Sequence, residues 1–172
     1  LESLEEQWKT KIAPASIDGL VKRDWLERLV CPVSAPVAAE GVIVSSLIDH
    51  NQVVALDETD GKELWRFTAG GRVDSPPTIY NGICLFGSHD GYIYALRLTD
   101  GSLCWKMRAA PRDERMISFG KVESVWPVMG SVLLDNGVAY ASAGRSQESD
   151  GGIIVHVFEP ATGKTLWSML IP

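Results

Sequence analysis

One aromatic residue and one carboxylate stand together in a segment that breaks the pattern of the surrounding sequence. Trp126 follows Glu123 within the insertion at residues 108–129, outside the tryptophan position that recurs elsewhere in the chain. An indole ring beside a carboxylate can stack on a sugar, another ring or a partner side chain. The alternative is that the insertion tucks Trp126 onto the body of the fold. We predict a ligand- or partner-binding site at Trp126 and Glu123.

Three further charged residues are candidates for the same kind of site. Arg72 and Asp74 lie on the link between two repeated units, and Arg145 lies in a polar loop at residues 144–152 that replaces a short turn. Loops on a rigid scaffold are where binding residues concentrate. We therefore expect Arg72, Asp74 and Arg145 to line one shared face. For Arg72 the alternative is hydrogen bonding between neighbouring units.

The histidines do not indicate a metal site. Asp49-His50 and His89-Asp90 occupy the same turn in successive units. Zinc requires ligands that converge on one point, and adjacent units are expected to splay these turns apart. We predict no metal ligands.

The cysteines do not indicate catalysis either. Cys31, Cys84 and Cys104 are widely spaced, form no C-x-x-C pair, and are predicted to be small buried residues. The sequence also lacks G-x-S-x-G, H-E-x-x-H and a phosphate-binding glycine loop. We predict no catalytic residue and no cofactor.

An internal repeat defines the elements that position these residues. Residues 55–65 read ALDETDGKELW, residues 95–105 read ALRLTDGSLCW, and residues 157–167 read VFEPATGKTLW. The interval from Trp105 to Trp167 is longer than the interval from Trp65 to Trp105, so it contains inserted sequence. The shorter interval is one period of the repeat, and a period of about 40 residues is typical of β-propeller blades.

Each unit is predicted to form four antiparallel strands. In the first unit these are residues 36–39, 42–46, 52–57 and 63–68, and Asp60-Gly61 supplies the tight turn before the last strand. The fold class is therefore all-β, a propeller arc of about three four-stranded blades. Large aromatic residues in the last strand of each unit are expected to fill the gap between blades. These structural tryptophans are Trp8, Trp65, Trp105 and Trp167.

The organisation of the chain follows from this repeat. Residues 1–10 are predicted to be the last strand of a preceding blade, and residues 11–30, with apolar residues at largely helical spacing, a short helical insertion. Residues 31–70, 71–110 and 130–172 are the three blades, and residues 111–129 are an inserted loop. We expect the chain to be part of a longer precursor and its open ends to meet further blades or other copies.

Composition excludes two classes of partner. The net charge is −6 and the isoelectric point is near 5.0, which argues against nucleic acid because that partner requires clustered Lys and Arg. The longest strongly apolar runs are strand-sized, well short of the roughly 20 residues that cross a bilayer. We predict no membrane span.

The sequences VVALDETDGKELWRF and SPPTIYNGICLFGSHDGYIYALRLTDGSLCWKM closely resemble the pyrroloquinoline-quinone-like (PQQ-like) propeller repeat. The resemblance covers about residues 31–110 and 130–169. It implies a ring of about seven or eight blades, more than this chain holds. The family includes quinone-dependent alcohol dehydrogenases, the propeller lipoprotein of outer-membrane protein assembly and uncharacterised exported proteins. It therefore implies a periplasmic or extracytoplasmic location.

Departures from the dehydrogenase pattern favour a binding role. Those enzymes resemble one another in a vicinal cysteine pair and in a cluster of acids and amides that holds Ca²⁺, and this sequence has no Cys-Cys pair. We predict a non-catalytic scaffold that binds a protein partner or a small extracytoplasmic ligand. The alternative is a portion of a quinone-dependent dehydrogenase whose cofactor site lies in other blades.

Overall fold

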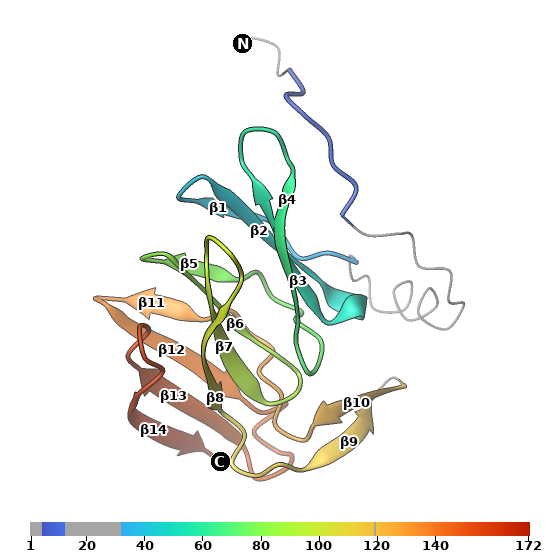
Figure 1. Ribbon diagram of the computed structural model, residues 1–172. Coiled ribbons are helices and arrows are strands. Elements are labelled where there is room, and N and C mark those ends of the chain that lie inside the picture. Colours follow the sequence, from blue (N-terminus) through green and yellow to red (C-terminus); the bar gives the residue numbers. More distant parts are fainter. Residues whose placement is uncertain (1–4, 13–31, 119) are drawn as a thin grey trace.

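The computed structural model describes residues 5–12, 32–118 and 120–172, in which nearly all regular structure is β-strand (Figure 1). Three four-stranded antiparallel sheets follow one another along the chain, and each is a meander of consecutive strands. A two-stranded sheet lies in sequence between the second and third. This confirms the predicted arc of three propeller blades.

The first blade contains β1 (Val37–Ala39), β2 (Val42–Leu47), β3 (Gln52–Asp57) and β4 (Glu63–Thr68), with the 3₁₀-helix η1 (Ile48–His50) after β2. The second contains β5 (Thr78–Tyr80), β6 (Ile83–Gly87), β7 (Tyr92–Arg97) and β8 (Leu103–Arg108). The third contains β11 (Leu133–Asp135), β12 (Val138–Ala143), β13 (Ile153–Phe158) and β14 (Thr165–Ile171). The extra hairpin is β9 (Arg115–Ser118) and β10 (Lys121–Ser124).

Two-residue turns set the register at the start of each blade. Asn81 and Gly82 both have positive φ, 46° and 73°, and join Tyr80 directly to its cross-strand partner Ile83. Consecutive left-handed residues match the twist of a tight hairpin, which explains the Asn-Gly pair. Because side chains alternate along a strand, this register determines which apolar residues face the neighbouring blade.

Tryptophans join each blade to the next in the same way. The indole Nε1 of Trp65 donates to the Leu98 carbonyl at 2.7 Å, and its ring lies against Gly101, where a Cβ would come within 2.7 Å of Cδ2. Trp105 donates to the Pro160 carbonyl at 3.0 Å, again over a turn glycine. These tryptophans therefore hold neighbouring blades at a fixed separation.

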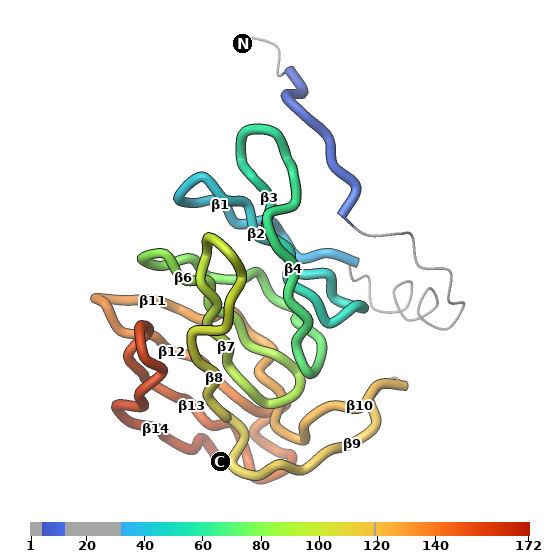
Figure 2. The backbone as a smooth tube through the Cα atoms, viewed as in Figure 1, coloured from blue at the N-terminus to red at the C-terminus, as the bar shows by residue number. Residues whose placement is uncertain are grey.

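Trp8 makes the equivalent contact at the start of the chain. Its Nε1 donates to the Glu58 carbonyl at 3.0 Å and its ring lies against Gly61. Residues 5–12 run beside the first blade without forming a strand (Figure 2). The predicted last strand of a preceding blade at residues 1–10 therefore shows its tryptophan contact, but no strand pairing in its described part.

Apolar clusters fill the two spaces between blades. One centres on Trp65, Phe86 and Tyr94, whose last two rings stack with centroids 5.3 Å apart. The other centres on Phe158 and Trp126, and Trp105 meets Phe158 edge-on at 5.8 Å. On the outer strand β14, Trp167 is 50% exposed. Within the described residues, Trp167 lacks a glycine turn of the kind that covers Trp8, Trp65 and Trp105.

One predicted element differs from the structure, and another lies outside the described residues. The insertion predicted as a loop at residues 111–129 contains the β9–β10 hairpin, because residues 115–118 and 121–124 pair in register. The helical insertion predicted for residues 11–30 falls almost entirely outside the described residues. No described helix has the length and hydrophobicity that a bilayer crossing requires.

Candidate functional site

The predicted site residues gather at one end of the blades. In an antiparallel meander, the turn between the second and third strands lies at the same end as the link to the next blade. This end, called the link face below, carries the turns at residues 48–51, 88–91 and 144–152 and the links at residues 69–77 and 109–132. The β9–β10 hairpin belongs to the second link (Figure 1).

Five charged or titratable side chains meet on the link face. Glu123 of β10 lies 3.5 Å from Arg72 Nε through Oε1 and accepts a hydrogen bond from Arg145 Nη2 at 2.6 Å through Oε2. Arg72 Nη2 donates to Asp74 Oδ2 at 3.1 Å. His89 stands between the two carboxylates, with Nε2 3.0 Å from Asp74 Oδ2 and Nδ1 3.2 Å from Glu123 Oε1. We call these five residues the polar cluster.

Main-chain hydrogen bonds hold the elements that carry the polar cluster. The His89 amide donates to the Arg72 carbonyl at 2.8 Å, and the Ser124 amide donates to the His89 carbonyl at 2.7 Å. The first link, the second blade and the hairpin are thereby joined. Gly71 permits this approach, because a Cβ there would come within 2.6 Å of the Asp90 amide nitrogen.

Burial and charge pairing set the ionisation of the cluster. Burial disfavours the Glu123 carboxylate, but His89 and Arg145 outweigh this and lower the pKa of Glu123 to about 2. The pKa of Asp74 is also lowered, because contact with His89 and Arg72 outweighs desolvation. The pKa of His89 is raised, because the two carboxylates outweigh its own desolvation. At neutral pH both acids are therefore ionised.

Several buried atoms of the cluster lack a well-aligned hydrogen bond. Four of the six lie within ion-pair distance of a partner, but the angles do not give a hydrogen bond. A buried polar atom without such a bond costs about 1–3 kcal/mol. The atoms are Arg72 Nε, Asp74 Oδ1, both ring nitrogens of His89, Glu123 Oε1 and Arg145 Nε. The cluster therefore has capacity for further polar contacts.

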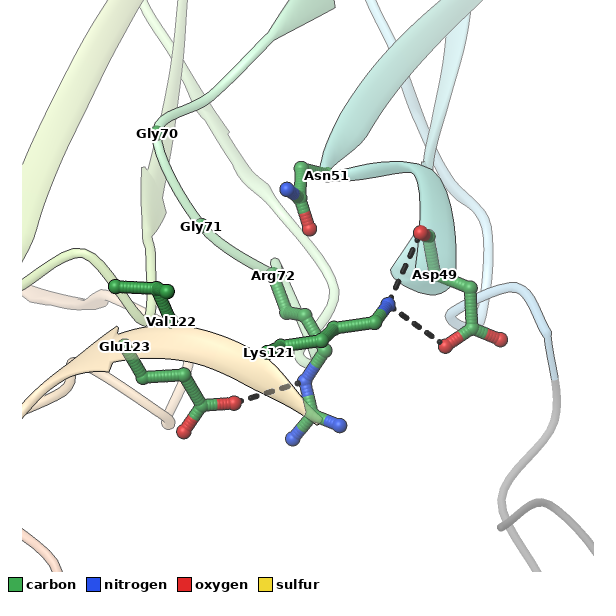
Figure 3. Close-up of a pocket in the computed structure, with 8 residues that line it drawn as sticks. All are labelled: Asp49, Asn51, Gly70, Gly71, Arg72, Lys121, Val122 and Glu123. Carbon is green, nitrogen blue, oxygen red and sulfur yellow. Dashed lines mark hydrogen bonds and ion pairs between the residues drawn. The ribbon is translucent and has the colours of Figure 1, made fainter. Parts of the chain in front are cut away.

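A pocket of about 360 Å³ opens beside the polar cluster (Figure 3). Lys121 of the hairpin crosses it and donates from Nζ to the Asp49 carbonyl at 3.0 Å and to Asp49 Oδ1 at 3.1 Å. This contact joins the second link to the first blade. The pocket is lined by Asp49, Asn51, Gly70, Gly71, Arg72, Lys121, Val122 and Glu123.

Trp126 lies apart from Glu123, its predicted neighbour in a site. It is 4% exposed and belongs to the apolar cluster between the second and third blades. Its Nε1 donates to the Asp150 carbonyl at 2.9 Å, and the Arg112 guanidinium lies 5.1 Å from its ring centroid. The remaining surface of Trp126 lines a second pocket of about 370 Å³. Packing accounts for most of this side chain, as the alternative interpretation expected.

The structure therefore brings together four of the five predicted site residues: Arg72, Asp74, Glu123 and Arg145. It adds His89, which sequence reasoning set aside on the expectation that its turn is splayed from other ligands. His89 is instead 2% exposed, because the hairpin folds back over its turn. The sequence feature that indicates His89 as a site residue is its position in a turn at the same end of the blades as the link that carries Asp74.

The two described cysteines lie in different environments, and Cys31 falls outside the described residues. Cys84 is buried as predicted, and burial raises the pKa of its thiol to about 12. Cys104 is exposed, so the prediction that it is buried is wrong. It lies on β8, the outermost strand of its blade, whose residues are exposed or half-buried.

The fold and this site define a β-propeller fragment with a polar link face. A family model described as "Outer membrane protein assembly factor BamB" matches residues 3–171. The chain therefore belongs to this family of PQQ-like propellers.

Two curated proteins illustrate the range of its relatives. The outer membrane protein assembly factor BamB of Burkholderia pseudomallei is 30% identical over 94 residues, 54% of this chain and 24% of that protein. The dehydrogenase subunit of the quinone alcohol dehydrogenase of Acetobacter aceti is 25% identical over 145 residues, 78% of this chain and 19% of that protein. The chain thus spans about a fifth to a quarter of these relatives.

Solved structures support the fold. BamB from Moraxella catarrhalis has a TM-score of 0.58 and 18% identity, with 80% of this chain and 36% of that chain covered. Quinohemoprotein alcohol dehydrogenase from Comamonas testosteroni has a TM-score of 0.66 and 17% identity, with 82% of this chain and 21% of that chain covered. At these identities the likeness concerns the fold alone.

The described residues do not provide the kind of acidic cluster that Ca²⁺ requires. Calcium requires six to eight oxygen ligands on one point. Within the described part of the chain no group of three or more His, Cys, Asp and Glu is placed to hold a metal. The two carboxylates of the polar cluster, Asp74 and Glu123, are already neutralised by arginine and histidine.

Proposed function

We propose that this chain is a non-catalytic segment of a larger exported propeller protein and binds a protein partner on its link face. One observation carries the proposal. Five ionisable side chains from two links and two turns converge there, and several of their buried polar atoms lack an aligned hydrogen bond. A partner that completes these bonds recovers the cost of leaving them unmade.

The ionisation of the two carboxylates in the cluster argues against either of them as a general acid. A general acid or base works best when its pKa lies near the operating pH. The pKa values of Asp74 and Glu123 are lowered, so both remain charged at neutral pH and neither holds a proton to donate. Their fixed negative charges instead orient the arginines, which suits recognition of a partner.

Two findings support a protein partner and an extracytoplasmic location. The matching family is described as an assembly factor for outer membrane proteins, and a relative with that name is 30% identical over the aligned region. We propose by this likeness that the whole protein acts in the periplasm. Further blades or other copies cover the exposed strand that carries Trp167.

A second candidate is part of a quinone-dependent alcohol or sugar dehydrogenase. The 25% identity with a quinone alcohol dehydrogenase subunit across 78% of the chain favours it. In that case the cofactor site is built by other blades, and this arc forms one wall of the ring.

Both hypotheses are tested on the full-length protein. It is incubated with PQQ and Ca²⁺, and dye-coupled oxidation of primary alcohols and aldoses is measured. We expect no oxidation; turnover that depends on both additions would establish the dehydrogenase hypothesis instead. In a deletion strain of the native host, we expect the wild-type gene to restore outer membrane protein levels. The double variant Glu123→Gln/Arg145→Gln, which removes one charge of each sign, should restore them poorly.

A further inference from the structure

The β9–β10 hairpin is held in a fixed position on the link face. A two-stranded hairpin is marginally stable alone, so its anchors matter. Val125 donates from its amide to the Glu114 carbonyl at 3.0 Å, which closes the base of the hairpin, and Ser124 bonds to the His89 carbonyl. Lys121 reaches Asp49 of the first blade, and Glu123 enters the polar cluster. The hairpin is therefore a rigid platform.

Its outward side carries an exposed aliphatic pair. Ile117 is 77% exposed and Val122 is 61% exposed, and the two residues are directly paired across the strands. Side chains alternate along a strand, so the same alternation that buries Glu123 turns Val122 outward. An outward-facing aliphatic pair on a charged surface marks a contact site when it adjoins a built polar site.

That polar site is the pocket beside the hairpin, because Val122 lines it. The charged groups around the pocket are Asp49 and Glu123 against Arg72 and Lys121, and each is ion-paired. The lining therefore has no net charge, and a charged ligand would have to give up its hydration without gaining a free counter-charge. An uncharged polar group loses the least hydration free energy when it enters the pocket.

Buried atoms on the pocket wall are ready to bind such a group. Asn51 Oδ1, Arg72 Nε and Glu123 Oε1 have no aligned hydrogen bond. Arg72 is 6% exposed and Glu123 is 1% exposed. Arg72 Nε can donate, and Asn51 Oδ1 and Glu123 Oε1 can accept, as an amide or hydroxyl group requires.

We infer that the hairpin and this pocket bind an extended peptide segment of the partner. One apolar side chain of the segment packs on Ile117 and Val122, and an Asn, Gln, Ser or Thr side chain a few residues away enters the pocket beside Asn51. The inference rests on the proposed function and specifies the chemistry of the partner. A peptide fits better than a saccharide, because the apolar surface is a pair of aliphatic side chains and none of the described residues that line the pocket is aromatic.

A random linear peptide library displayed on phage tests this on the full-length protein. Peptides selected on the wild type are synthesised, and their affinities are measured by isothermal titration calorimetry. Ile117→Ser/Val122→Ser removes the apolar contact. Asn51→Gly removes the amide and preserves the left-handed backbone at φ 56°. Leu103→Ser is the matched control, because Leu103 is 50% exposed at the opposite end of the second blade. Near-ultraviolet circular dichroism checks that every variant is folded.

The expected result is a family of peptides that share one apolar and one uncharged polar residue. The hairpin variant and Asn51→Gly should each weaken their binding by about tenfold, with Leu103→Ser unchanged. Peptides that are insensitive to both variants, or no enriched peptide, would overturn the inference. Asn51-dependent binding of a maltose or glucose probe in place of peptides would overturn it too. Any of these results leaves the proposed function open to its own test, because a folded partner can still bind elsewhere on the link face.

Discussion

Substitution of Gly101 by alanine measures how tightly the tryptophan contact holds neighbouring blades. Gly101 has φ +69°, and a Cβ would lie 2.7 Å from Cδ2 and 2.8 Å from Cγ of Trp65. Ordinary carbon contacts are about 3.5–4.0 Å, so the indole must move by about 1 Å. That movement also stretches the 2.7 Å bond from Trp65 to the Leu98 carbonyl.

A control variant separates the backbone contribution to the loss of stability from the contribution of the tryptophan contact. The left-handed backbone costs alanine about 1–2 kcal/mol at either position. Gly41 has φ +77° and nothing lies within 4 Å of the position that a Cβ would take, so Gly41→Ala should show that cost alone. Gly101→Ala adds overpacking of about 1–3 kcal/mol and a weakened hydrogen bond of about 1 kcal/mol. It should therefore cost about 2–4 kcal/mol more than Gly41→Ala.

The assay is urea unfolding of the full-length protein, followed by tryptophan fluorescence, with the free energy of unfolding obtained for wild type and both variants. Equal losses for Gly101→Ala and Gly41→Ala, within about 0.5 kcal/mol, would refute the claim that the tryptophan contact fixes the distance between blades.

Three further outcomes follow from the structure. Glu123→Gln should lower the free energy of unfolding by about 3–5 kcal/mol, because Arg72 and Arg145 lose a buried partner. Glu114→Gln, at an exposed position, should change it by less than about 1 kcal/mol. Urea unfolding of both variants measures the difference. The pKa of His89 is raised in the folded protein, so the stability that its charge contributes is full below about pH 6.5 and is lost as the pH rises through its folded-state pKa. Thermal melts of the wild type and His89→Asn across this pH range test it. A stability advantage of the wild type that grows with pH would contradict it. The 172-residue chain expressed alone should self-associate through β14, and Trp167→Ser should shift it towards monomer in sedimentation velocity; a monomeric wild type would speak against that edge as a blade contact.

The blades were predictable because their signals are local and repeated. Asn81-Gly82 and the glycine before each outer strand require positive φ, and the tryptophans recur at fixed distances from these turns. Those features are determined within one unit and its immediate neighbour, so a period of about 40 residues was sufficient to place them.

The candidate site was only partly predictable, because its contacts lie outside the repeat. Arg72 and Asp74 were recognised from their place on a link, and Glu123 and Arg145 from insertions. The other contacts of the site depend on how the insertion folds. Its hairpin brings Glu123 onto His89, a pairing between distant positions that no period encodes. Shortly after Glu123 the chain has left β10, and Trp126 enters the core.

Site-specific photo-crosslinking in the native host tests the central claim that the link face is the binding surface. The full-length protein carries p-benzoylphenylalanine either at Val122, on the link face, or at Leu103, at the opposite end of the blade and similarly exposed. We expect irradiation to produce a discrete adduct at position 122, with one partner identified by mass spectrometry, and none at position 103. An adduct at 103 with none at 122 would contradict the claim.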